Sequence, residues 1–200
     1  NDPTISNIIL SHYPHYSTWT AHPSKMRNIY SKGRIFLSGH LHPRDKIIIH
    51  YDKLLSAITP PASYTDLTAL ITVEKNSAIV YHQIDVTQKE PILVVTYPVP
   101  IEQLSDDQVF NRKNFPVRVL VFSQKPLDLS LIIDDQTVGK LEISKEMKKD
   151  VNLYTCEVKS NLNDGRHTLR IEGDSSYEMK FFVGEKSPKL TESISRFSTP

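Results

Sequence analysis

Short apolar runs, separated by polar and turn residues, make up the first half of the chain. Runs of this length with no helical period predict β-strands. We therefore expect strands at residues 7–10, 35–37, 47–49, 67–73 and 79–84. The first two are continuously apolar, which is typical of strands buried on both faces. One helix is expected at residues 24–30, where Met26, Ile29 and Tyr30 share a face.

A second set of strand-like runs follows the polar stretch 87–91. These runs are short and rich in β-branched and aromatic residues, and they lie at residues 92–96, 117–122, 129–133, 153–158, 167–171 and 177–183. Asp134-Asp135 and Asn163-Asp164-Gly165 are typical of turns, and the second is a hairpin signal. Strands at this spacing predict a β-sandwich of immunoglobulin-like topology.

The pattern divides the chain into three parts. We expect one domain at residues 1–91, the sandwich at 92–185 and a polar tail or tether at 186–200. The chain starts without a methionine just ahead of the first expected strand, so we expect part of the first domain to lie upstream.

The composition of the chain limits the classes of binding partner that we expect. The chain carries 24 Lys and Arg against 23 Asp and Glu, a net charge of +1, which gives no long-range attraction to nucleic acid or to an anionic membrane. No run of 18 or more apolar residues occurs, so no membrane-spanning helix is expected within these residues. The single cysteine, Cys156, cannot form an intramolecular disulfide and fits a structural position on a strand face.

Histidines follow two of the expected strands. Ser38-Gly39-His40-Leu41-His42 ends the run 35–37, and Ser11-His12-Tyr13-Pro14 ends the run 7–10. Open sheets place their ligands at the carboxyl ends of the strands, and neighbouring parallel strands would bring His12 to the His40/His42 pair. We expect Gly39 to permit the sharp turn. Three imidazoles form a plausible partial shell for zinc, manganese or iron.

These two motifs, His-x-Pro after one strand and Gly-His-x-His after a later one, resemble the last two metal-binding motifs of calcineurin-like metallophosphoesterases. The resemblance implies that His12 and His40 bind one divalent ion and His42 a second. It also implies a phosphate-ester substrate. The implied fold is mixed: the C-terminal part of an α/β domain of the four-layer β-sandwich type, then an all-β immunoglobulin-like sandwich.

The chain also resembles membrane-anchored members of the transmembrane protein 62 type, in which a phosphoesterase domain is followed by a β-sandwich and then by membrane helices. The likeness extends to residues 92–98, 118–123 and 164–169. It implies a membrane-anchored parent protein, with the anchor outside this chain.

The family's earlier motifs, Asp-x-His, Gly-Asp-x-x-Asp and Gly-Asn-His-Asp/Glu, do not occur in these 200 residues. The resemblance therefore implies that the chain holds only part of a two-metal site, and we expect at most weak binding of a single ion by this chain alone, with no catalytic residue within it. The missing N-terminal half of the domain is then the expected partner. The alternatives are a phosphoesterase-like scaffold without catalysis, and an adhesion-type β-protein that leaves the histidine motifs unexplained.

Several further residues have two interpretations. His15 and His22, in a loop with Tyr13, Tyr16 and Trp19, could line a substrate pocket, but packing or solvation explains them more simply. Arg44 and Asp45 could reach a phosphate, although a surface ion pair is the commoner explanation. A hairpin turn accounts for Asp134-Asp135 better than a calcium site does. Alternation within strands accounts for His50, His82 and His167.

Overall fold

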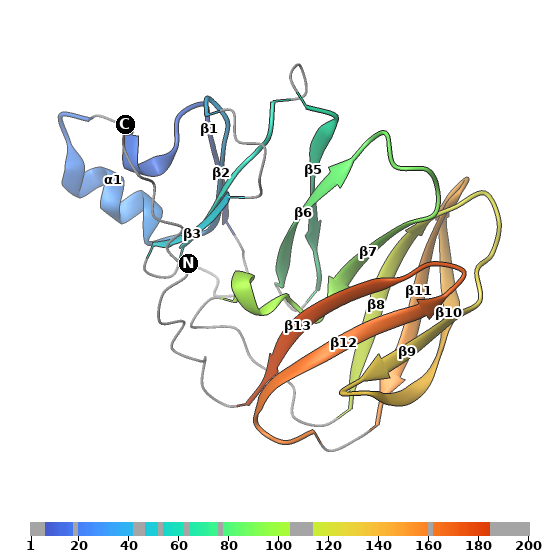
Figure 1. Cartoon of the computed structure of the whole chain (residues 1–200). Helices are drawn as coiled ribbons and strands as arrows, with labels where there is room; N and C mark the ends of the chain where they lie inside the picture. Colours follow the sequence, from blue (N-terminus) through green and yellow to red (C-terminus); the bar gives the residue numbers. More distant parts are fainter. Residues whose placement is uncertain are drawn as a thin grey trace.

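The computed structural model describes residues 7–17, 20–41, 47–51, 54–61, 65–75, 78–104, 114–159 and 162–184 (Figure 1). Strands dominate these residues. In chain order the elements are β1 (Asn7–Ser11), η1 (His15–Ser17), α1 (Pro23–Tyr30), β2 (Gly33–Ser38), β3 (Ile47–Tyr51), β4 (Leu54–Ile58), β5 (Leu67–Val73), β6 (Ile79–Asp85), β7 (Ile92–Tyr97), η2 (Ile101–Gln103), β8 (Phe115–Phe122), β9 (Leu129–Ile133), β10 (Gln136–Lys148), β11 (Val151–Val158), β12 (Gly165–Gly173) and β13 (Tyr177–Val183).

A four-stranded sheet in the order β1-β2-β4-β3 forms the first half of the molecule. β1, β2 and β4 run parallel, and β3 is antiparallel to β4. The expected helix is confirmed as α1. It covers one face of this sheet through a small apolar cluster of Tyr30, Phe36 and Leu54, with Ile9 and Met26 packed against it.

The antiparallel hairpin β5–β6 covers the other face of the sheet (Figure 1). Ile79 and Tyr81 of β6 pack against Ile35, Leu55 and Ala57 of the sheet. The Tyr81 hydroxyl also donates a hydrogen bond to the Ile58 carbonyl, 3.2 Å away. Helix, sheet and hairpin therefore form three successive layers.

The second half is an antiparallel β-sandwich that is nearly closed, with strand order β13-β12-β9-β10-β11-β8-β7. β8 alternates strictly between buried and half-buried positions, as expected for a strand with one face on a core. β10 pairs with β9 through its first residues and with β11 through its last ones, and so it connects the two faces. The core contains Val119, Leu131 and Phe181 among its least exposed side chains.

The segment around β6 contributes to the cores of both halves. Alternate residues point to opposite sides, so Ala78, just before β6, and Val80 join the buried cluster of the sandwich, while Ile79 and Tyr81 face the four-stranded sheet. The expected boundary near residue 91 lies in the connection between β6 and β7. The hairpin β5–β6 consequently belongs to the packing of both halves.

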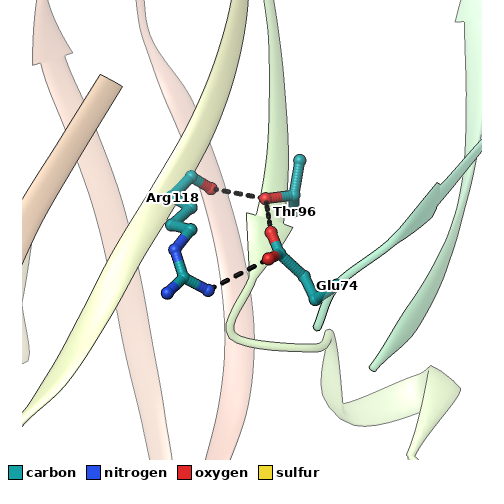
Figure 2. A network of polar contacts seen from close by, with 3 residues as sticks. All are labelled: Glu74, Thr96 and Arg118. Carbon is teal, nitrogen blue, oxygen red and sulfur yellow. Dashed lines mark hydrogen bonds and ion pairs between the residues drawn. The ribbon is translucent and has the colours of Figure 1, made fainter. Parts of the chain in front are cut away.

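Polar contacts reinforce this junction (Figure 2). Arg118 of β8 donates from Nη1 to Glu74 Oε2 at 3.0 Å, and the Thr96 hydroxyl of β7 donates to Glu74 Oε1 at 2.5 Å. Farther along, the buried Gln103 side chain of η2 accepts from the Tyr81 backbone N–H at 2.7 Å and donates to the Tyr81 carbonyl at 2.8 Å. A side chain thus takes the place of a neighbouring strand at the edge of β6.

One of the two expected turns forms a hairpin, and it is the weaker signal of the two. Asp134 and Asp135 connect β9 to β10, with φ angles of 47° and 66°. Left-handed φ at both central residues is the geometry of a tight hairpin. The hairpin expected at Asn163-Asp164-Gly165 was wrong, because β11 pairs with β8 and β10 whereas β12 pairs with β9 and β13.

The expectation that the first strand is buried on both faces was also wrong. β1 lies at an edge of its sheet, and the side chains of Ile8 and Leu10 are 42% and 73% exposed. Only Ile9 packs, against the helix side. By contrast, β2 is almost wholly buried, as its sequence predicts.

Within the described residues, no helix has the length and apolar character that crossing a membrane requires.

Candidate metal-binding site

The strand order brings His12 and His40 together. β1 and β2 are adjacent and parallel, with Ser11 paired to Ser38 at their carboxyl ends. His12 therefore leaves β1 beside the Gly39-His40 turn that leaves β2. The Gly39 backbone N–H donates to the His12 carbonyl at 3.2 Å, which fixes the two strand ends to one another.

The two imidazoles face each other through their ring nitrogens. His12 Nε2 and His40 Nδ1 are 3.1 Å apart, and the ring centroids are 5.0 Å apart with the planes at 72°. The hydrogen bond between them is exposed to solvent. In neutral rings one of these nitrogens must donate and the other accept, and with both lone pairs free the pair can instead bind a cation.

The backbone after β2 takes an unusual form at His40, which has a φ of 65°. We expected Gly39 to provide this turn, and the left-handed residue is His40 instead. A Cβ on Gly39 would meet only Thr59 Oγ1 and the His12 carbonyl, at the ordinary contact distances of 3.8 and 3.9 Å. A non-glycine residue in the left-handed region stores strain, and such strain is concentrated at functional sites.

Thr59 holds the end of β2 in place. Its backbone N–H and its hydroxyl both donate to the Ser38 carbonyl, at 2.7 and 2.9 Å. Ser38 itself is buried, and its hydroxyl has no hydrogen-bond partner in the described part of the chain. The turn that carries His40 thus starts from a fixed point.

Tyr13 completes an aromatic group around the two histidines. Its ring centroid lies 4.3 Å from that of His40 and 4.9 Å from that of His12. Sequence reasoning named Tyr13 only as one aromatic residue of a loop. Its position directly after His12 was the available signal, because a residue next to a ligand at a strand end must lie near the same site.

His15 does not join this group. Its side chain is buried against the rings of Tyr30 and Phe36, and its Nδ1 lies 3.0 Å from the Ser56 hydroxyl of β4. Burial lowers the pKa of the imidazole below its ordinary value. The packing interpretation is therefore the correct one for His15, which anchors the turn that follows His12.

Of the remaining candidate residues, His22 makes no hydrogen bond or ring contact with the pair, and the others are not described. His22 is exposed just before α1. His42, Arg44, Asp45 and Trp19 lie outside the described residues. Among the residues that the structure does describe, no group of three or more His, Cys, Asp or Glu side chains is placed to hold a metal.

The other strand histidines have structural contacts. His50 Nε2 lies 2.6 Å from the Glu102 carbonyl, and the buried His82 lies 3.2 Å from the Thr72 hydroxyl. His167 Nδ1 lies 2.5 Å from Asp134 Oδ2 beside the β9–β10 hairpin. These contacts fall on strands away from the His12–His40 pair.

Comparison of the chain with protein-family models, with curated proteins and with solved structures gives no match.

Proposed function

We propose that this chain supplies part of the metal site of a metal-dependent phosphoesterase, with His12 and His40 as ligands of one divalent ion and His42 as a ligand of a second. The observation that carries the proposal is the approach of His12 Nε2 to His40 Nδ1 at the ends of two adjacent parallel strands. Phosphate-ester hydrolysis by a calcineurin-like enzyme is the reaction that the resemblance implies.

The separation of the two nitrogens suits a shared ion. Zinc binds histidine nitrogen at about 2.0–2.1 Å, so two adjacent ligands of one tetrahedral or octahedral ion lie about 3 Å apart. The 3.1 Å between the ring nitrogens matches this spacing. Zinc, manganese and iron all accept imidazole, and the site does not select among them.

A complete site needs acidic ligands that the motifs of this chain lack. Two neutral imidazoles bring no negative charge to balance a divalent ion, and in the proposed enzyme the carboxylates come from the domain's upstream half. A pair of divalent ions would supply an activated water and stabilise the charge on the phosphoryl oxygens. The part of this chain is to hold His12 and His40 rigidly through the Gly39–His12 and Thr59–Ser38 hydrogen bonds.

The architecture is compatible with this proposal. The layers of helix, sheet and hairpin are compatible with part of a layered α/β domain, and the all-β second half is compatible with the immunoglobulin-like sandwich that the resemblance implies. In the proposed parent protein the sandwich separates the phosphoesterase domain from a membrane anchor outside this chain.

The proposal is tested with a polypeptide extended upstream through the carboxylate motifs. We expect two bound ions per chain and hydrolysis of bis-p-nitrophenyl phosphate that is lost in His40→Ala. His22→Ala, which changes an exposed histidine that makes no hydrogen bond or ring contact with the pair, is the matched control and should keep full activity. A folded, extended polypeptide with neither metal nor turnover would favour the catalytically inactive scaffold.

A further inference from the structure

A polar cleft lies where the β5–β6 hairpin meets the sandwich. Its volume is about 220 Å³, and three parts of the chain form its walls: β6, the region from β7 to η2, and the turn before β13 together with Tyr177. This volume is roughly that of seven waters in the liquid. It is below the size of a drug-sized pocket and suits a molecule of about one sugar ring.

The free edge of β6 forms one wall. Among the described strands β6 pairs only with β5, and Gln103 satisfies the outward N–H and C=O of Tyr81. In an antiparallel strand the backbone groups point outward at every second residue, so those of Gln83 face the same side as those of Tyr81. The backbone N–H and C=O of Gln83 therefore lie next to the cleft. Gln103 bonds only the backbone groups of Tyr81 and leaves those of Gln83 available to a ligand.

Gln83 also has an orphan side-chain atom. Its Oε1 is buried and has no hydrogen-bond partner within the described part of the molecule. A buried acceptor without a donor carries a desolvation cost, and in native proteins such atoms are usually satisfied by water or by a ligand. Gln83 is one of the residues that line the cleft.

The lining has the chemistry of a site for a neutral, hydroxylated molecule. None of the residues that line it is Lys, Arg, Asp or Glu. Amide and hydroxyl groups come from Gln83, Gln88, Gln103, Ser175, Ser176 and Tyr177. Burial, and to a lesser extent Glu102, raises the pKa of the Tyr177 phenol, so it stays protonated and can donate.

We propose that this cleft binds a small neutral polyhydroxylated ligand, of the size of a single hexose. The amides and hydroxyls of the walls would exchange hydrogen bonds with its hydroxyls, and the ring of Tyr177 would give it an apolar surface. This site is separate from the histidine pair and needs no metal. A negative result for the sugar site would therefore leave the phosphoesterase proposal unaffected, and the reverse also holds.

The test is saturation-transfer NMR on the whole 200-residue chain, with methyl α-D-glucopyranoside and N-acetyl-D-glucosamine as probes. We expect transfer to at least one sugar, and we expect this transfer to fall about threefold or more in Tyr177→Phe and in Gln83→Leu. Tyr16→Phe, which removes an exposed phenol outside the cleft, should leave the transfer unchanged.

Backbone amide shifts of the wild-type chain on sugar addition give a second readout that does not depend on the variants folding. Shifts confined to the cleft residues would support the site. No transfer to either sugar, equal transfer in both cleft variants, or shifts elsewhere on the surface would overturn it and leave a cleft filled with water only.

Discussion

Glu74 and Arg118 form an ion pair that joins the end of β5 to the second strand of the sandwich (Figure 2). Their side chains are only 15% and 32% exposed, and Thr96 donates to the second carboxylate oxygen. Because the hydrogen bonds satisfy both oxygens of a mostly buried carboxylate, removal of either partner leaves the other charge poorly solvated.

Breaking this pair should destabilise the chain. We expect Glu74→Ala to lower the free energy of unfolding by about 1.5–3 kcal/mol, the usual worth of a hydrogen-bonded charged contact that is partly buried. Urea denaturation measures this. The control is Lys140→Ala, whose ion pair with Asp128 is exposed on both sides and should cost no more than about 1 kcal/mol. Equal losses of unfolding free energy in the two variants would show that the Glu74–Arg118 pair contributes no more to stability than an exposed ion pair.

Gln103 should stabilise the folded chain through its two hydrogen bonds to the edge of β6. Gln103→Ala removes both partners of the Tyr81 backbone and leaves buried polar groups unpaired, at a cost of about 1–3 kcal/mol. Gln136→Ala, at an exposed position in β10, is the matched control. Thermal unfolding of the two variants side by side is the measurement, and a shift no larger than that of the control would contradict the role given to Gln103.

Substitution of the two glycines at the ends of β12 distinguishes the cost of a steric clash from the cost of backbone strain. Both have positive φ, +146° at Gly165 and +140° at Gly173. A Cβ would meet nothing within 4 Å at Gly165, but at Gly173 it would lie 2.1 Å from the Asp128 carbonyl oxygen. Gly173→Ala should therefore destabilise well beyond Gly165→Ala, which should cost about 1–3 kcal/mol through strain alone. Denaturant midpoints that fall equally would refute the close approach of β12 to Asp128.

His15 should make stability depend on pH. Its pKa is lowered by burial from 6.5, so the unfolded chain binds a proton that the folded chain does not as the pH falls below 6.5. The contribution of neutral His15 to the free energy of unfolding is fully present above about pH 6.5. It is lost progressively as the pH falls from there to the lowered pKa of His15 in the folded chain. His15→Leu should reduce the loss seen between about pH 7.5 and about pH 5.5 in urea unfolding, and His22→Ala should not. An identical loss in His15→Leu would rule this out.

Strand positions were predictable where alternation or continuous burial governs the sequence. The expected runs at 67–73 and 129–133 coincide with β5 and β9. β4 was missed. Its run Leu54–Ile58 is short, contains Ser56 and Ala57, and is buried at every position, so it shows no alternation that would distinguish a strand from another buried segment. β10 was missed because most of its residues are exposed, and its three register shifts disrupt the period of two.

Burial of β1 could not be inferred from its sequence, because an apolar run does not show what covers it. The neighbourhood of His12 and His40 could be predicted, since it needs only two adjacent parallel strands. The left-handed backbone at His40, the contact of Tyr13 and the burial of His15 depend on how the turns pack, which no local pattern encodes. His42 remains a prediction from its motif.

The central claim is that His12 and His40 bind one metal ion together, and calorimetric titration of the 200-residue chain with Zn²⁺ tests it most directly. We expect weak binding of one ion per chain, with affinity reduced about tenfold or more, that is by about 1.4 kcal/mol or more, in His12→Ala and in His40→Ala, and unchanged in His22→Ala. Binding that is absent from the folded chain, or that persists undiminished in both variants, would contradict the account.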